Sequence, residues 1–450
     1  MSAFMTRAIR AYRTIFSIHE IEDTPTLQWV CGVLLFFFFI TFASWVGDSN
    51  LTIESAAAGK SVCWPYIPDC GTLYFLHDPS TDYSQTTFYM ALYALMLTGV
   101  WSMWKKSWHV VHAIIFALFA WKTLVVFALS YTHADPYHYY HLILTALLLF
   151  VPHKEFFLKT GFVLLYFMSV TTKLNSTWIL GTYFTSLKPG LPLLPDALTA
   201  LFTNFVIFMQ MIGSWFLLSR HRLLQRTVFV FFLAFHLYSG VFVMYTYPSV
   251  SLPSLIILFG PLYRHTPIPF GARTIAGWSI IGLVILFQAI GFILPGDRRL
   301  TLEHNRFGMF MFDANHQCQV DVDTYYRENP PNLSAGGTGT CGDFFCITEH
   351  SLHDMDGATM RHVRYESPIS WNRCDPYVWW AKLHSRCSVD PAIDRIALTI
   401  NHSINGGPFV RTVETGNICA ETYRLFERNM WIHSPPDTEI IGFPVENSYR

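Results

Sequence analysis

The stretch YFMSVTTKLNSTWILG (residues 166–181) ends an apolar segment with a lysine, an asparagine and a tryptophan. If the segment crosses a membrane, Lys173 lies at or just inside the membrane edge. Two interpretations of this lysine remain open. An interfacial lysine commonly extends its ammonium group to water, whereas an amine held in a dry pocket can act as a base.

The composition is that of a membrane protein. The 450-residue chain is 52% hydrophobic and 17% aromatic, and only 14% of its residues are charged. Soluble domains carry about 25% charged residues. With a mean hydropathy of +0.31, the chain is predicted to be integral to a lipid bilayer. Its formal net charge of -1 gives no indication of nucleic-acid binding.

Nine apolar segments follow one another along the first two thirds of the chain. Two of them are shorter than the ~20 residues that a perpendicular spanning helix needs. These two are either extended by neighbouring residues or half-buried. The sequence therefore predicts an α-helical polytopic membrane protein with segments at residues 28–46, 87–104, 109–130, 139–152, 156–173, 197–219, 226–246, 252–263 and 273–294.

The residues before the first segment form a separate N-terminal region, 1–27. Arg7, Arg10 and Arg13 follow one another at a spacing of three and share one face if this region is helical. This pattern favours a cytoplasmic amphipathic helix on anionic lipid. It also resembles a mitochondrial transit segment, which remains an alternative.

The cations in the loops predict the orientation of the chain, because cytoplasmic loops carry an excess of lysine and arginine. Loops 131–138 and 247–251 carry none, and Arg298 and Arg299 are the minor exceptions. Nine crossings then place residues 295–450 outside the cytosol or matrix. The basic residues on the inner side, besides those near the N-terminus, are Lys105, Lys106, Lys154, Arg220, Arg222, Arg226, Arg264 and Arg273.

Eight of the nine cysteines fall on the predicted outer side, and only Cys31 lies in an apolar segment. An even number of outer cysteines predicts disulfides in an oxidising compartment. We expect Cys63 to pair with Cys70. The other six are expected to form three bridges whose pairing the sequence leaves open. They are Cys318, Cys341, Cys346, Cys374, Cys387 and Cys419.

The region after the last apolar segment, residues 295–450, is richer in polar residues, glycine, proline and cysteine than residues 28–294. RIALTINHSI (395–404) alternates like a half-buried strand, whereas PPNLSAGGTGTCG (330–342) is typical of a loop. We expect a small disulfide-rich extracytosolic domain with more strand than helix. The expected location is the endoplasmic reticulum membrane or a bacterial inner membrane, with the mitochondrial inner membrane as an alternative.

Ionisable residues at membrane depth are candidates for functional sites, because they are costly to bury there. Lys122 either pairs with another segment or extends to water. His236 is either a packing residue or part of a site. In YTHADPYHYYHL (131–142), His138 and His141 are three residues apart and can share a helix face. No cysteine or carboxylate joins them at a strong metal-binding spacing, so we expect no metal.

The loop charges place His138 and Lys173 at the same outer end of two consecutive segments, so the two side chains are candidates for one pocket. The stretch that contains Lys173 resembles a segment of the vitamin K-dependent γ-glutamyl carboxylase family, which reads tyrosine-phenylalanine, small residues, lysine-leucine, two polar residues, tryptophan and glycine. The broader group is the horizontally transferred transmembrane family, and lipase maturation factors share a similar span. Other stretches that resemble the carboxylase family, in the same order, are PTLQWVCGVLLFFF (25–38), HYYHLILTALLLF (138–150), FHLYSGVFVMYTYPSVSLPSL (235–255) and NRFGMFMFDANHQCQVDVD (305–323).

The resemblance implies a mechanism. The family's catalytic lysine falls on Lys173 and its catalytic histidine on His138. The neutral lysine removes a proton from a reduced quinone of the vitamin K type, and oxygen adds. The strong base so formed deprotonates a carbon acid such as glutamate Cγ, CO2 captures the carbanion, and an epoxide is left. His138 would hydrogen-bond the developing oxyanion, and Tyr166, Trp178 and His236 are the candidate quinone-binding residues.

A second class of function stays open beside this carboxylase-like lyase. The family's enzymes have a much larger lumenal region with a propeptide-binding surface, whereas about 155 residues follow the last apolar segment here. A non-catalytic subunit or an assembly factor of a membrane complex would use the same aromatic composition and compact outer domain. The expected partners are therefore the bilayer, a prenylated quinone or lipid, and other membrane subunits in the second class.

Overall fold

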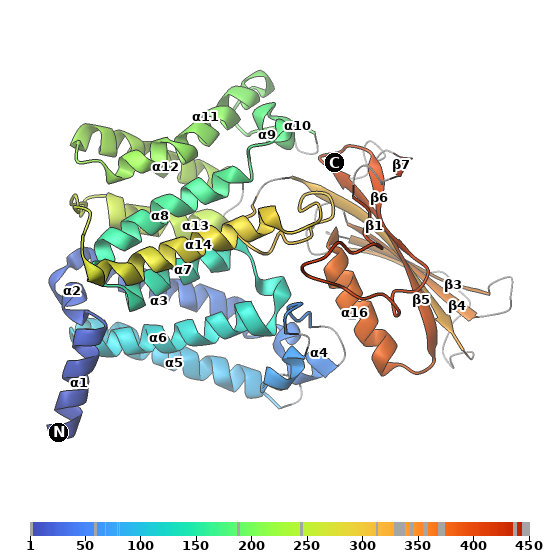
Figure 1. Ribbon diagram of the computed structural model, residues 1–450, viewed down its shortest axis with the longest axis horizontal. Coiled ribbons are helices and arrows are strands. Elements are labelled where there is room, and N and C mark those ends of the chain that lie inside the picture. The colour runs from blue at the N-terminus through green and yellow to red at the C-terminus, as the bar shows by residue number, and fades with distance from the viewer. Residues whose placement is uncertain are drawn as a thin grey trace.

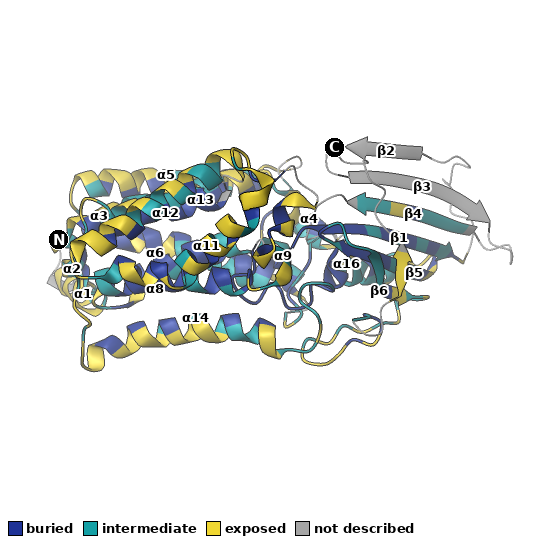
Figure 2. Cartoon of the chain, turned by 90° about the horizontal axis from the view of Figure 1, so that it is seen from above, coloured by how far each residue is buried: buried dark blue, intermediate teal, exposed yellow. Residues whose placement is uncertain are grey.

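The computed structural model has a helical part up to residue 293 and a mainly β part from residue 316 onwards (Figure 1). Helix α1 and the β part lie at opposite ends of the long axis in both Figure 1 and Figure 2. The structure describes residues 3–57, 61–67, 69–78, 80, 82–186, 190–243, 246–311, 314–327, 338–342, 345–353, 359–367, 374–434 and 439–442.

The N-terminal region is helical, as its arginine spacing predicts. Helix α1 (Ala3–Ile15) is followed by α2 (Ile18–Asp23). Arg13 forms a 2.5 Å ion pair with Glu22 across the turn between them. On the other face of α1, the Tyr12 hydroxyl lies 2.7 Å from His112 Nδ1 in α6. The apolar face of α1 therefore packs on the helical part, and its arginines are exposed.

Each of the nine predicted apolar segments contains a helix. The segment 197–219 is not one continuous α-helix, because α11 ends at Met211 and a 3-10 helix continues from Gly213 to Leu218. Near the N-terminus α4 (Ile53–Ala57) is a short helix in the first outer loop. The helices of the nine segments are α3 (Pro25–Trp45), α5 (Ser84–Trp104), α6 (Trp108–Leu124), α7 (Pro136–Phe150), α8 (Lys154–Thr171), α11 (Thr199–Met211), α12 (Arg222–Phe242), α13 (Thr246–Phe259) and α14 (Ile275–Ile293).

Within the described residues, four helices are long and apolar enough to cross a membrane. They cover Pro25–Trp45, Trp108–Leu129, Arg222–Phe242 and Ala272–Ile293. The second of these is α6 continued by a π-helical turn, Val125–Leu129. A bilayer core about 30 Å thick requires roughly 20 residues of helix, a length that each of the four reaches.

Large apolar side chains cover the outside of the helical part, which Figure 2 shows as exposed stretches on α5, α11 and α14. Leu97, Trp104 and Ile293 are 71%, 78% and 75% exposed. A soluble protein rarely leaves so large an apolar surface in water. Lipid chains solvate such side chains without cost, and the helices satisfy their own backbone polar groups.

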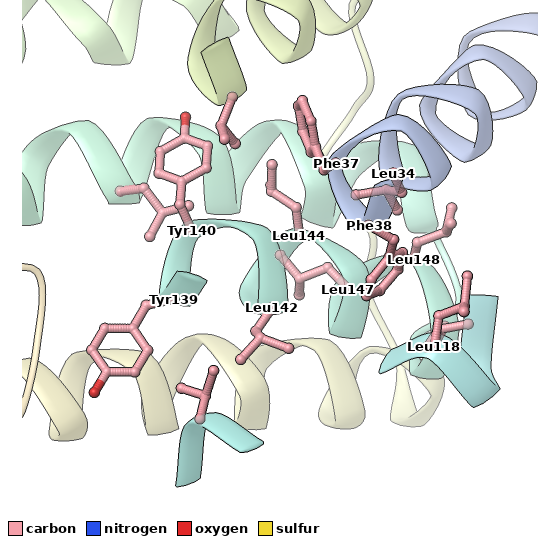
Figure 3. Close-up of a cluster of buried hydrophobic side chains, with 14 of the residues drawn as sticks. Leu34, Phe37, Phe38, Leu118, Tyr139, Tyr140, Leu142, Leu144, Leu147 and Leu148 are labelled. Carbon is pink, nitrogen blue, oxygen red and sulfur yellow. The ribbon is translucent and has the colours of Figure 1, made fainter. Parts of the chain in front are cut away.

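Helix α7 lies in the middle of the apolar core. Figure 3 shows Leu144, Leu147 and Leu148 of this helix beside Phe37 and Phe38 of α3, and these residues belong to one buried cluster. The helices approach closely where a glycine removes the side chain. At Gly277 of α14, a Cβ atom would come within 2.3 Å of the Phe157 ring of α8, so only glycine permits this contact.

The described strands of the C-terminal part form one antiparallel sheet with the order β2-β3-β4-β1-β5-β6-β7. The predicted strand 395–404 is confirmed as part of β5, which pairs with β1 in the middle of the sheet. Helix α16 (Pro376–Val389) packs on one face, and its Leu383 belongs to the same buried cluster as Val320 and Leu398. The strands are β1 (His316–Tyr326), β2 (Thr338–Gly342), β3 (Phe345–His353), β4 (Thr359–Ser367), β5 (Ile393–Ile404), β6 (Phe409–Thr415) and β7 (Ile440–Gly442).

Three disulfides join described cysteines. The predicted Cys63–Cys70 bridge is confirmed. Among the C-terminal cysteines the pairs are Cys318–Cys374 and Cys387–Cys419, which attach α16 to the sheet and to the segment after β6. The backbones of 341 and 346 lie opposite each other in β2 and β3, and their side chains lie outside the described ones. The predicted loop 330–342 was wrong at its end, because residues 338–342 form β2 and pair with β3. Its residues 330–337 lie outside the described ones. Cys31 is free and buried.

The C-terminal part is joined by direct contacts to the end of the helical part that lies opposite α1. The Tyr131 hydroxyl donates to Asp375 Oδ2 (3.1 Å), and an Arg306 guanidinium nitrogen donates to the Ala134 carbonyl (2.9 Å). On another side, the Asn315 amide donates to the Tyr183 carbonyl (2.7 Å). Several segments that are distant in sequence therefore meet at this junction.

Glu303 carries a buried carboxyl group in the connection between the two parts. Its side chain is 5% exposed and accepts hydrogen bonds from the Thr301 hydroxyl (2.9 Å) and the Asn429 amide (3.3 Å). Burial raises the pKa of Glu303 from 4.5 to about 7, with smaller contributions from the acidic groups of Asp375 and Asp297. Between these two pH values the folded protein holds a proton that the unfolded chain releases.

We expect Glu303 to make the protein less stable as the pH rises from about 4.5 to about 7, by up to ~3 kcal/mol, because each pKa unit corresponds to ~1.4 kcal/mol. Glu303→Gln removes this dependence, so its melting temperature should exceed that of the wild type at about pH 8 and not at about pH 5. Thermal unfolding in detergent measures the melting temperature of each protein at the two pH values. Asp375, whose pKa burial raises to about 6, is present in both proteins, so the difference between the two pH profiles comes mainly from Glu303. Parallel pH profiles would contradict the assignment.

Candidate active site

Lys173 lies in the turn that follows α8. Its backbone N–H donates to the Val170 carbonyl (2.9 Å), which closes the last turn of that helix. Asn175 then starts the short helix α9 (Ser176–Ile179), because its side-chain oxygen accepts from the backbone N–H groups of Thr177 (3.1 Å) and Trp178 (3.3 Å). This cap reverses the chain and brings the Trp178 ring back over the lysine.

The Lys173 amine is enclosed by protein. The residue is 3% exposed, its Nζ donates to Gln210 Oε1 of α11 at 2.8 Å, and it lies 5.2 Å from the centre of the Trp178 ring. Within the described part of the chain, no acidic side chain forms an ion pair or hydrogen bond with it. The amine therefore does not extend to water and has neutral partners.

A buried aromatic cluster lies at the contact of α8, α12 and α13. The Tyr166 hydroxyl is hydrogen-bonded to His236 Nε2, and His236 Nδ1 lies 3.2 Å from the Ser251 hydroxyl. The Tyr166 ring stacks on Phe232 with centroids 4.5 Å apart. Of the three predicted quinone-binding residues, Trp178 contacts the predicted catalytic lysine, and Tyr166 and His236 contact each other in this cluster.

Helix α7 contributes a further buried hydroxyl to this cluster. Figure 3 shows Tyr139 and Tyr140 pointing to opposite sides of α7. The Tyr140 ring meets Tyr247 and Phe162 edge to face, with centroids 5.6 and 5.7 Å apart. The Tyr140 hydroxyl is buried, and no described group hydrogen-bonds it. An unpaired buried hydroxyl is costly.

The structure describes no contact between Lys173 and His138. His138 lies in the first turn of α7, where Asp135 caps the helix by accepting from the His138 backbone N–H (2.9 Å). Its ring contacts Trp45 of α3 and Tyr137, with centroids 5.2 and 5.1 Å apart. Loop charges place a residue at one end of a helix, but they do not determine the direction of its side chain. His138 turns toward α3, whereas Lys173 turns toward α11.

His138 belongs instead to a second buried polar group around Lys122. The Lys122 amine donates to the Thr41 hydroxyl (2.9 Å) and lies 2.7 Å from His141 Nδ1. These contacts join α6 to α3 and α7, so Lys122 pairs with other helices and does not extend to water. Among the described residues, no group of His, Cys, Asp or Glu is arranged to hold a metal ion.

Sequence reasoning missed Gln210, Tyr140 and Ser251, which complete the surroundings of Lys173 and His236. Gln210 carried a usable signal, since it is an uncharged polar residue inside an apolar segment. Tyr140 and Ser251 carried none, because tyrosine and serine are common at helix contacts in membranes. No family model, curated protein or solved structure matches this chain.

Proposed function

We propose that the chain is a membrane enzyme of the vitamin K-dependent carboxylase type, in which Lys173 takes a proton from a hydroquinone held by the aromatic cluster. One observation carries the proposal. The Lys173 amine is buried against a neutral amide and an indole ring, with no acidic partner among the described residues. Such surroundings disfavour the charged form of a lysine, so the neutral amine is available as a base. The sequence resemblance supports the same role.

The neighbouring residues have complementary roles in this proposal. The Trp178 ring stabilises the ammonium group that forms when Lys173 accepts a proton, and Gln210 Oε1 fixes the direction of the amine. Tyr166 with His236, and Tyr140 from the other side, supply hydrogen-bond donors for the ring oxygens. When bound, the hydroquinone would be oxidised by O2 to the epoxide with release of water, and this oxidation would supply the strong base that deprotonates the carbon acid before CO2 is added. The closed helical surroundings exclude water from the base.

The contacts favour the Tyr166–His236 pair as the donor to a developing oxyanion, a role that the resemblance assigns to His138. Tyr166 lies on α8, the helix that ends just before Lys173, and hydrogen-bonds His236. The described contacts of His138 are instead with α3 and with residues near it on α7. A preorganised donor in a dry site stabilises negative charge more than it does in water. We therefore include His236 and Tyr166 among the site residues and give His138 no contact with the substrate.

The test of this function is a turnover assay with the full chain in lipid nanodiscs. The protein receives a reduced prenylated naphthoquinone, O2 and CO2, and mass spectrometry measures the epoxide. We expect epoxide formation that depends on the protein and on O2. If correctly folded protein leaves the hydroquinone unchanged, the enzyme proposal fails and the non-catalytic membrane subunit or assembly factor takes its place.

We also propose that all nine segments cross the membrane, with residues 295–450 on the extracytosolic side of the endoplasmic reticulum or of a bacterial inner membrane. Arg10, Arg13 and Arg273 gather at the α1 end of the helical part, as cytoplasmic cations do. The three described disulfides lie at the other end or in the β part, as an oxidising compartment favours.

A protease-protection experiment tests this topology. In sealed vesicles whose cytosolic face is exposed to added protease, we expect a C-terminal tag to survive. A protease site inserted in the 219–221 loop should be cut. Detergent should make the tag sensitive, which controls for accessibility. Loss of the tag in intact vesicles would contradict an odd number of crossings.

A further inference from the structure

Two hollows meet where α1 packs on the inner end of the helical part. The first has a volume of about 870 Å³, and its lining includes Arg10 and Arg13 of α1 and Arg273 before α14. The second has a volume of about 520 Å³. Ile9 and His109 line both, so the two hollows are adjacent.

The first hollow is basic. Besides three arginines it contains His19 and His109, and none of the described residues that line it is acidic. Arg13 is already paired with Glu22 at 2.5 Å. Arg10 and Arg273 come from elements far apart in sequence, and no described ion pair neutralises either one. The arrangement favours an anion that two guanidinium groups can hold from different sides.

The second hollow is apolar. It runs along one face of α6, where Val110, Ile114 and Ala117 follow one another at helical spacing, and Leu95 of α5 forms the opposite wall. Tyr12 of α1 also contributes to the lining. A groove of this kind, open at the periphery of a membrane protein, suits a hydrocarbon chain.

We propose that the paired hollows bind one anionic phospholipid, with its phosphate between Arg10 and Arg273 and one acyl chain along Val110 and Ala117. The charge of the first hollow and the apolar lining of the second match the two halves of such a lipid, and the hollows lie next to each other, as the headgroup and acyl chain of one lipid do. The bound lipid attaches α1 to the helical part. The site is separate from Lys173 and does not depend on the proposed reaction.

The experiment is native mass spectrometry of the full chain with added phosphatidylglycerol or phosphatidylcholine that carry identical acyl chains. We expect phosphatidylglycerol to be retained at least about tenfold better. Arg10→Gln with Arg273→Gln should lower its retention by about tenfold or more, since each basic contact adds roughly 1 kcal/mol. The matched control is Arg7→Gln with Lys106→Gln, which removes the same charge from the same end outside the lining and should change retention less than about threefold.

Two further measurements distinguish a lipid headgroup from free phosphate as the bound anion. Inorganic phosphate should not displace the lipid, and Ala117→Phe, which fills the groove at an exposed position, should weaken phosphatidylglycerol binding without touching the arginines. Equal retention of both lipids, or an equal loss in both double variants, would overturn the site. Full displacement by inorganic phosphate would overturn the lipid and leave a free-phosphate site. Unchanged elution in size-exclusion chromatography confirms that each variant is folded.

Discussion

Replacing Lys173 by methionine is expected to lower hydroquinone epoxidation by about 10³-fold or more, because a positioned general base contributes roughly 10²- to 10⁴-fold. Methionine keeps the length and apolar part of the side chain, so the contact with the Trp178 ring is retained while the proton acceptor is lost. The measurement is epoxide formed per minute per folded protein in nanodiscs.

Lys122→Met is the matched control, since it also removes a buried amine with neutral described partners, Thr41 and His141. We expect this variant to retain its turnover per folded molecule. Lys173→Ala adds a second control, because a small primary amine supplied in solution should partly restore its turnover. A structural lysine would show no such rescue. Equal losses in the Lys173 and Lys122 variants, or full activity without Lys173, would contradict the role as a base.

The donor assignment is resolved with the same assay. If the Tyr166–His236 pair stabilises the developing charge, His236→Gln should lower turnover by about 10²-fold, comparable to the loss of one oxyanion donor. His138→Gln should have a much smaller effect, because its described contacts lie with α3 and neighbouring residues of α7. The opposite result would return the role to His138 and would contradict the assignment made from contacts.

Removal of the Cys318–Cys374 disulfide by paired serine substitutions is expected to lower the free energy of unfolding by about 4 kcal/mol. The bridge joins residues 56 apart in sequence, and the loss of loop entropy in the unfolded chain grows with that separation. It also holds the start of α16 beside β1, next to the contact between Asp375 and Tyr131. Urea unfolding in detergent, followed by tryptophan fluorescence, measures the change.

The Cys63–Cys70 bridge provides the comparison, because it closes a loop with a separation of only 7 residues. Its removal is expected to cost about 2 kcal/mol by the same reasoning. If the Cys318–Cys374 variant does not accumulate, graded reduction of the wild type with dithiothreitol gives the same ranking of the two bridges. A larger loss from the short loop would show that native packing, and not chain entropy, sets the contribution of each bridge.

Features that depend on residues close in sequence were predictable without the fold. The apolar segments contain helices, because a run of apolar side chains long enough for a membrane has to satisfy its backbone internally. The spacing of Arg7, Arg10 and Arg13 predicted the helical N-terminal region, and the alternation in 395–404 predicted β5. Cys63 and Cys70 lie seven residues apart, so their pairing could also be predicted from their short separation in sequence.

The surroundings of Lys173 were decided by the tertiary structure. The sequence identified Lys173, Trp178 and His236, but Gln210 and Tyr140 reach the site only because α11 and α7 pack against α8. The direction of His138 was equally unpredictable, since each step along a helix turns a side chain by about 100° and the partner helices set which direction is buried. Loop charge indicates only at which end of a helix a residue lies. The contacts of its side chain also depend on how the helix is rotated about its axis. For this reason the sequence placed both residues at one end of the protein, and only the packing of distant helices turned one toward α3 and the other toward α11.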